Sequence, residues 1–153
     1  MKAIQDQLEH NHCYGCGADN EKGYRIKSYY DGEVSRCRFT PGPEHSAGPP
    51  QYVYGGLIAS LIDCHCVGTS IAAHYRRDGR EMGDGGDAIW CVTGRLTVNY
   101  LAPTPIDAPI DLEASIEEIT DKKAIVHCRV LSGETVTAEA EVIAVRVPPS
   151  WRG

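Results

Sequence analysis

The sequence predicts an α+β fold in which one curved antiparallel sheet of about six strands wraps around one long buried helix. Residues 55–75 contain no proline and are apolar on nearly all sides, as in a helix that is buried all round. From residue 89 onward, apolar and polar side chains alternate, which is typical of strands with one covered face. Because such a helix must be covered on every side, a single curved sheet is the simplest partner.

The 153 residues fit one domain preceded by a short arm. Residues 1–23 are polar, contain a Cys-x-x-Cys turn, and predict an irregular N-terminal arm. Residues 24–153 form the predicted domain. Its first elements are two short strands, Tyr24–Tyr30 and Glu33–Phe39, joined by Asp31-Gly32, a strong signal for a two-residue hairpin turn.

The remaining elements follow a proline-rich loop over residues 40–51. The helix begins at Gly55 and ends near Arg76, Arg77 and Gly79, since cations and glycine are typical of helix C-termini. Alternation then predicts four strands, which cover residues 89–103, 110–119, 122–131 and 135–147.

Charge and composition restrict the classes of partner and the compartment. The net charge of −6 argues against sequence-independent binding of nucleic acid, which requires a basic face. No segment reaches the roughly 18–20 apolar residues that cross a bilayer, and the N-terminus does not resemble a secretory signal. We therefore expect no membrane partner and a cytoplasmic protein whose seven cysteines, an odd number, are reduced.

Several motifs together resemble the hotdog-fold thioesterases, and most of all the phenylacetate-pathway-type acyl-CoA thioesterases. They are CYGCG at residues 13–17 with a later glycine at Gly23, the YGG…D segment from Tyr54 to Asp63, and VTGRLTVNYLAP at residues 92–103. The family usually has His-Gly-Gly at the start of the helix, whereas here Tyr54 replaces the histidine. The resemblance implies hydrolysis of a coenzyme A thioester by a homodimer or homotetramer, with neither a cofactor nor a metal.

Asp63 is the main catalytic candidate, because it interrupts an otherwise apolar helix. A buried carboxylate is normally paired, protonated or functional. It therefore either bonds a hydroxyl or amide in a purely structural role, or acts as general base or nucleophile at a thioester carbonyl.

Gly55 and Gly56 open the helix, where the first amide N–H groups lack intrahelical acceptors. These donors fit an oxyanion hole, although a Gly-Gly pair also suits a tightly packed helix entry. Eight residues separate Gly55 from Asp63, which is about 12 Å along a helix. One carbonyl group cannot contact both positions, so a joint role requires Gly55 of one protomer and Asp63 of another.

Other site residues follow from the resemblance. Thr93 matches the hydroxyl that orients the water or the carboxylate, and Thr97, four residues along, is the second choice on the same expected strand face. His45 and Gln51 lie in the loop where the family often binds the attacking water. Tyr54 is expected to bind substrate or to pack at the dimer interface. Arg76, Arg77 and Arg80 either bind the phosphates of coenzyme A or complement the C-terminus of the helix.

Cysteine and histidine residues offer a further candidate. His10, His12, Cys13 and Cys16 resemble half of a zinc site, but no second Cys/His pair follows at finger spacing. Consecutive Cys64, His65 and Cys66 point in different directions around the helix and are expected to be packing residues. We therefore expect no metal.

The leading hypothesis is an acyl-CoA thioesterase that uses Asp63, Gly55 and Thr93. Two alternatives stay open. One is a catalytically silent protein that binds acyl-CoA or another small ligand on the same scaffold, suggested by Tyr54. The other is an interaction module whose N-terminal arm is stabilised by zinc.

Overall fold

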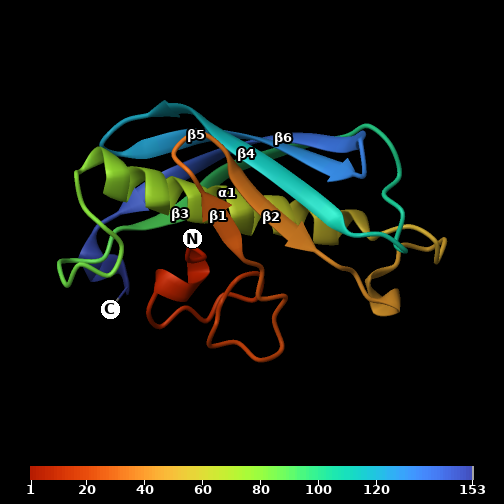
Figure 1. The fold of residues 1–153 in the computed structure, drawn as a ribbon, viewed down its shortest axis with the longest axis horizontal. Helices are drawn as coiled ribbons and strands as arrows, with labels where there is room; N and C mark the ends of the chain where they lie inside the picture. The colour runs from red at the N-terminus through yellow and green to blue at the C-terminus, as the bar shows by residue number, and fades with distance from the viewer. Residues whose placement is uncertain (153) are drawn as a thin grey trace.

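One helix packs against one six-stranded antiparallel sheet in the computed structural model, which describes residues 1–152 (Figure 1). This confirms the predicted hotdog architecture. The helix is α1 (Gly55–Arg77). The strands are β1 (Ser28–Tyr30), β2 (Ser35–Phe39), β3 (Trp90–Tyr100), β4 (Ile110–Ile119), β5 (Lys123–Ser132) and β6 (Thr135–Val147).

The strand order in the sheet is β1-β2-β4-β5-β6-β3. The three C-terminal strands β4, β5 and β6 form consecutive hairpins, whereas β3 precedes them in sequence and pairs with β6 at the end of the sheet. One side of the 11-residue β3 therefore has no neighbouring strand within residues 1–152. A long strand with one unpaired edge is a template for pairing with another chain.

The hydrophobic core lies between α1 and the inner face of the sheet. Strand side chains alternate, so that Leu112, Val126 and Val142 are fully buried while their sequence neighbours are more exposed. Leu57 and Leu61 of the helix fill the space against them. Burial of this apolar surface is the main favourable contribution to folding.

The N-terminal arm covers the side of α1 that the sheet leaves open. Figure 1 shows residues 1–23 looping along the helix on the side opposite strands β4–β6. The Ile4 N–H donates to the Ser28 carbonyl at the start of β1, and the Gln5 side chain bonds Ser28 in the interior. The helix is consequently held between the sheet and the arm.

Two expectations from the sequence were wrong. The first hairpin does not turn at Asp31-Gly32 alone, because β1 begins only at Ser28 and a four-residue loop, 31–34, separates it from β2. The Val34 N–H donates to Asp31 Oδ1 and stabilises this longer loop. In addition, α1 is long and apolar enough to cross a membrane by length and composition, although 72% of its most apolar stretch is buried inside the fold. The apolar composition of α1 is explained by its burial against the sheet.

Candidate active site

Asp63 and Thr93 meet where the middle of α1 approaches edge strand β3. The Thr93 hydroxyl donates a hydrogen bond to Asp63 Oδ1. Asp63 is partly buried on a helix whose other central side chains are mostly buried. The structure therefore brings together the carboxylate and the hydroxyl that the sequence assigned to the same site.

The surroundings of Asp63 raise the pKa of its carboxyl group above the ordinary value. Burial is the main cause, and negative charge on Cys13 adds to it, whereas the hydrogen bond from Thr93 lowers the pKa. Among the side chains of residues 1–151, no lysine, arginine or histidine forms an ion pair with Asp63. A desolvated carboxylate without a cationic partner is a stronger base than one on the surface.

A β-bulge at Gly94 determines which face of β3 carries Thr93. Thr93 lies opposite the fully buried Ala144 of β6, but the register shifts by one residue before Arg95. Thr97 consequently lies opposite the exposed Glu141, on the outer face. The expectation that Thr97 shares the face of Thr93 was wrong, because one extra residue reverses the alternation of side chains.

The start of α1 presents amide groups without acceptors. Within residues 1–152 neither the Gly55 nor the Gly56 N–H donates a hydrogen bond, and no side chain caps the helix. The Tyr100 hydroxyl of β3 donates to the Gly55 carbonyl at 2.6 Å. The Tyr54 ring folds back over Gly56, since a Cβ atom at Gly56 would lie 2.3 Å from Tyr54 Cζ. A side chain at Gly56 would therefore require the exposed Tyr54 ring to move.

The two halves of the expected site remain apart within one chain. Gly55 and Asp63 lie on one continuous helix, so about 12 Å of helix axis separates them. Between them, Gly56, Ala59 and Ser60 are partly exposed, as is Val67 beyond Asp63. Residues three or four positions apart lie on the same face of a helix, so these residues form a partly exposed stripe along α1. The stripe includes Asp63 and lies beside the edge of β3 that has no described neighbouring strand.

Two predicted substrate-binding residues lie in the loop before the helix. The His45 Nδ1 atom accepts a hydrogen bond from the Gly42 N–H at 2.9 Å, and its ring contacts the rings of Tyr24 and Phe39. Gln51 is exposed, and its backbone carbonyl oxygen accepts a hydrogen bond from the Ile106 N–H at 3.0 Å. His45 thus stabilises a turn, and Gln51 keeps its side chain in solvent.

The arginines lie at the opposite end of α1. The Arg76 guanidinium lies over the Tyr30 ring at 5.4 Å, and Arg77 pairs with Asp121 at 2.8 Å. Arg76 is 21 residues from Gly55, about 32 Å along the helix, so the structure does not bring these cations to the glycine-rich end.

A cavity of about 220 Å³ adjoins Asp63 and Thr93. Its walls are mostly apolar, and they include three cysteines that the sequence analysis did not group together: Cys13, Cys16 and Cys64. The expectation that Cys64 only fills space was incomplete, because the arm docks its Cys-x-x-Cys turn directly onto this residue. His10 and His12 instead line a separate cavity of about 910 Å³.

Tyr100 is a further residue that the sequence analysis did not identify. Its place at the end of β3 gives no local signal, because only the packing of β3 against the helix start brings the hydroxyl to Gly55.

Comparison with known proteins identifies one family. A family model described as the thioesterase superfamily matches residues 50–139. Acyl-coenzyme A thioesterase THEM4 of Xenopus laevis is 28% identical over 125 residues, which cover 80% of this chain and 50% of that protein. The Mus musculus protein of the same name is 25% identical over 130 residues, or 83% and 50% of the two chains. The chain therefore spans about half the length of these curated relatives.

Solved structures agree with this comparison. A thioesterase superfamily protein from Shewanella loihica PV-4 superposes with a TM-score of 0.67 at 36% identity, and the match covers 91% of this chain and 96% of that one. The E. coli PaaI protein from the phenylacetic acid degradation operon superposes with a TM-score of 0.64 at 15% identity, over 82% and 81% of the chains. The second likeness is one of fold alone.

Proposed function

Because the chain belongs to the thioesterase superfamily, we propose that it hydrolyses an acyl-coenzyme A thioester with Asp63 as general base. The observation that carries this proposal is the hydrogen bond from Thr93 to a partly buried Asp63, which forms no ion pair with any described side chain, beside a mostly apolar cavity. The curated relatives are acyl-coenzyme A thioesterases by name, which supports acyl-coenzyme A as the substrate class.

In the proposed reaction, water attacks the thioester carbonyl carbon. As the new C–O bond forms, the Asp63 carboxylate accepts a proton from the water. Negative charge then develops on the carbonyl oxygen, where amide N–H groups of Gly55 and Gly56 stabilise it. Collapse of the intermediate breaks the C–S bond. Asp63 then returns the proton that it had accepted to the sulfur atom, and coenzyme A leaves as the thiol. The products are a carboxylic acid and free coenzyme A.

The site is composite in this proposal, with Asp63 and Thr93 from one protomer and the Gly55–Gly56 amides from another. The separation of about 12 Å along α1 supports it, because one carbonyl cannot reach both ends. The unpaired edge of β3 supplies a surface for association, and it carries apolar side chains such as Leu96, which is 36% exposed. Antiparallel pairing of two β3 strands would continue the sheet across the dimer and juxtapose the two helices.

Tyr54 favours one alternative function, the binding of an acyl-CoA without turnover. Its ring covers Gly56, one of the two proposed amide donors, and a tyrosine hydroxyl is no base near neutral pH. Saturable binding of an acyl-CoA without release of thiol would support this alternative.

The decisive experiment measures thiol release from short, medium, long and aromatic acyl-CoAs. We expect at least one substrate to be hydrolysed, and Asp63→Asn to lower kcat by roughly 10²–10⁴-fold, the usual contribution of a general base. Asp121→Asn is the matched control, since this carboxylate pairs with Arg77 on the surface. No hydrolysis of any of these esters, or full activity of Asp63→Asn, would contradict the proposal.

A further inference from the structure

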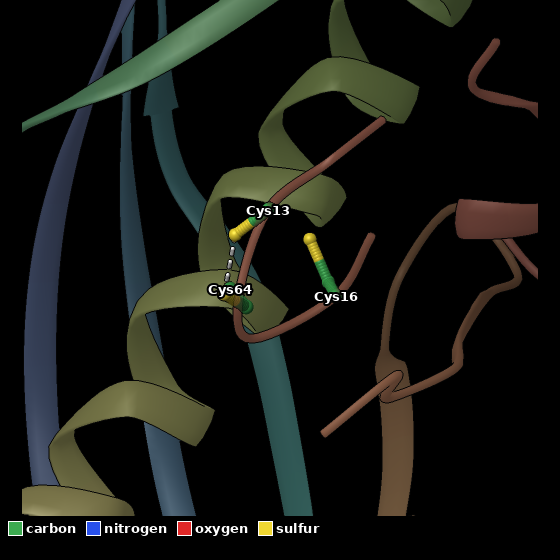
Figure 2. A group of neighbouring side chains, drawn as sticks. All are labelled: Cys13, Cys16 and Cys64. Carbon is green, nitrogen blue, oxygen red and sulfur yellow. Dashed lines mark hydrogen bonds between the residues drawn. The ribbon is translucent and has the colours of Figure 1, made fainter. Parts of the chain in front are cut away.

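Three cysteine sulfur atoms from two distant segments converge beside the candidate active site. Cys13 and Cys16 come from the arm, and Cys64 comes from α1 next to Asp63 (Figure 2). The three Sγ atoms lie within 4.8 Å of one another, and those of Cys13 and Cys64 are 3.6 Å apart. Figure 2 shows the turn of the arm passing over the helix, so that all three side chains face one small region.

This spacing matches the ligand sphere of a thiophilic metal ion. Zinc binds thiolate sulfur at about 2.3 Å in a tetrahedral arrangement, which places neighbouring sulfur atoms about 3.8 Å apart. The distance between Cys13 and Cys64 is close to this value, and the Cys16 sulfur lies within 4.8 Å of both.

The backbone of the turn is shaped to hold these sulfurs in place. The Gly17 N–H donates to the Cys13 carbonyl at 2.8 Å, and the Cys13 N–H donates to Asn11 Oδ1 at 3.1 Å. A Cβ atom at Gly17 would lie 2.4 Å from the Cys13 nitrogen. At Gly15 it would lie 2.3 Å from Cys64 Sγ. The two glycines therefore permit a tight turn that approaches the helix closely.

No positively charged side chain in the described lining of the cavity compensates negative charge on the three cysteines. Hydrogen bonds from the Cys16 and Cys64 thiols and from the Gly15 and Cys16 amides lower the pKa of Cys13, which favours its thiolate. The hydrogen bond with Cys13 is the main cause that raises the pKa of Cys16 and of Cys64, because a thiol that donates to a thiolate resists deprotonation. No lysine, arginine or histidine belongs to the described lining of the cavity, which already contains Asp63. A divalent cation is the partner that would stabilise three thiolates together.

We propose that Cys13, Cys16 and Cys64 bind a thiophilic divalent cation, Zn²⁺ in particular, with a water molecule from the cavity completing the coordination. Thiolate ligands select zinc over oxygen-preferring ions such as Mg²⁺ and Ca²⁺. The ion would tie the N-terminal arm to α1 one residue from Asp63. This site differs from the zinc site considered from the sequence, because its third ligand is Cys64 and it includes neither His10 nor His12.

The test measures metal content and affinity, both of which are independent of hydrolysis. The full-length protein is purified under reducing conditions, loaded with Zn²⁺, dialysed and analysed for metal. Co²⁺ is then substituted to observe absorption from thiolate-to-metal charge transfer. We expect about one zinc per chain, and a loss of affinity of roughly 100-fold or more in Cys64→Ser and in Cys13→Ser. We also expect chelation of the loaded protein to lower its Tm.

Cys66→Ala is the matched control. Cys66 lies two residues further along α1, but it is buried against Cys128 on the sheet and lies outside the cluster. It should bind zinc as the wild type does. Three results would overturn the proposal: no zinc retained by fully reduced protein, equal affinity in Cys64→Ser and wild type, or a disulfide between two of the three cysteines that forms despite bound zinc, detected by a loss of two hydrogens in the intact mass.

Discussion

Thr93 on the edge strand donates a hydrogen bond to Asp63 in the middle of the central helix, so that one bond joins the sheet to the candidate base. The bulge at Gly94 decides that Thr93 faces inward and that Thr97 faces outward. A Cβ atom at Gly94 would lie 2.8 Å from Val145 Cγ2 and 3.3 Å from the Ile143 carbonyl oxygen, so glycine is needed where the strand changes register.

Replacement of Thr93 by valine should lower kcat/KM by roughly 10–100-fold, since the lost bond is made to a charged group. The hydrogen bond from Thr93 lowers the pKa of Asp63, so its removal raises that pKa further. The acidic limb of the pH–rate profile should therefore move to higher pH, because Asp63 is then ionised only at higher pH. Thr97→Val is the control and should leave the profile in place. An unchanged acidic limb in Thr93→Val would count against Asp63 as the base.

The role of the Gly55 amide can be tested without a change to the helix. Gly55 is the first residue of α1, where proline is well tolerated, and Tyr54 has a φ of −59° and a ψ of 128°, outside the α region that a following proline disfavours. Gly55→Pro removes the N–H and should lower kcat by roughly 10²–10³-fold. Gly55→Ala keeps the N–H, and its Cβ atom would lie 3.6 Å from the Tyr100 ring, an ordinary contact. Similar activities of the two variants would exclude this N–H as an oxyanion donor.

A composite site also predicts complementation between inactive variants. A heterodimer of Asp63→Asn with Gly55→Pro carries one doubly damaged site and one intact site. Random assortment should therefore restore about one quarter of the wild-type activity when the two variants are co-refolded. The measurement is thiol release, with each variant refolded alone as the control. Activity no greater than the sum of the two separate variants would argue for sites within single chains.

His65 predicts a loss of stability in acid. The Ser28 hydroxyl is 2.7 Å from Nδ1 of this buried ring, and Nε2 lies 3.0 Å from the Ser35 carbonyl. Burial lowers the pKa of His65 to about 4, whereas the unfolded chain has the ordinary value of about 6.5. Between these values the unfolded state binds the additional proton, so stability falls as pH decreases from about 6.5 to 4.

The contribution of His65 over this interval is about 3 kcal/mol in the free energy of unfolding. Urea unfolding of the wild type and of His65→Gln, repeated from pH 7 to pH 4, measures it. The variant is less stable at neutral pH but should lose less stability on acidification. Equal slopes in the two proteins would show that His65 does not retain its neutral form in the fold.

The order of elements could be read from the sequence because it depends on local periodicity. Residues 55–75 contain no proline and would have no polar face as a helix, so they were predicted to form a buried helix. In the structure this helix extends to Arg77. Alternation over residues 110–147 predicted three strands with short joints, since adjacent antiparallel strands need only local turns. Asp63 was identifiable for the same reason, as a charge within an apolar run.

Other features depend on contacts between distant segments. The inward position of Thr93 and the outward position of Thr97 result from a one-residue bulge, which simple alternation cannot reveal. The Tyr100 hydroxyl reaches Gly55 only because the end of β3 packs against the start of α1.

The sequence by itself determined the helix, the strands and the candidate carboxylate, because each is encoded by a pattern within one continuous segment, the longest of which is the 23-residue helix. Only the tertiary structure decided that Cys64 meets Cys13 and Cys16, which are about 50 residues away along the chain. That meeting depends on how the N-terminal arm docks on α1, and docking is governed by the packing of Gly15 against the helix and the bonds of Gln5 to Ser28 rather than by any local pattern.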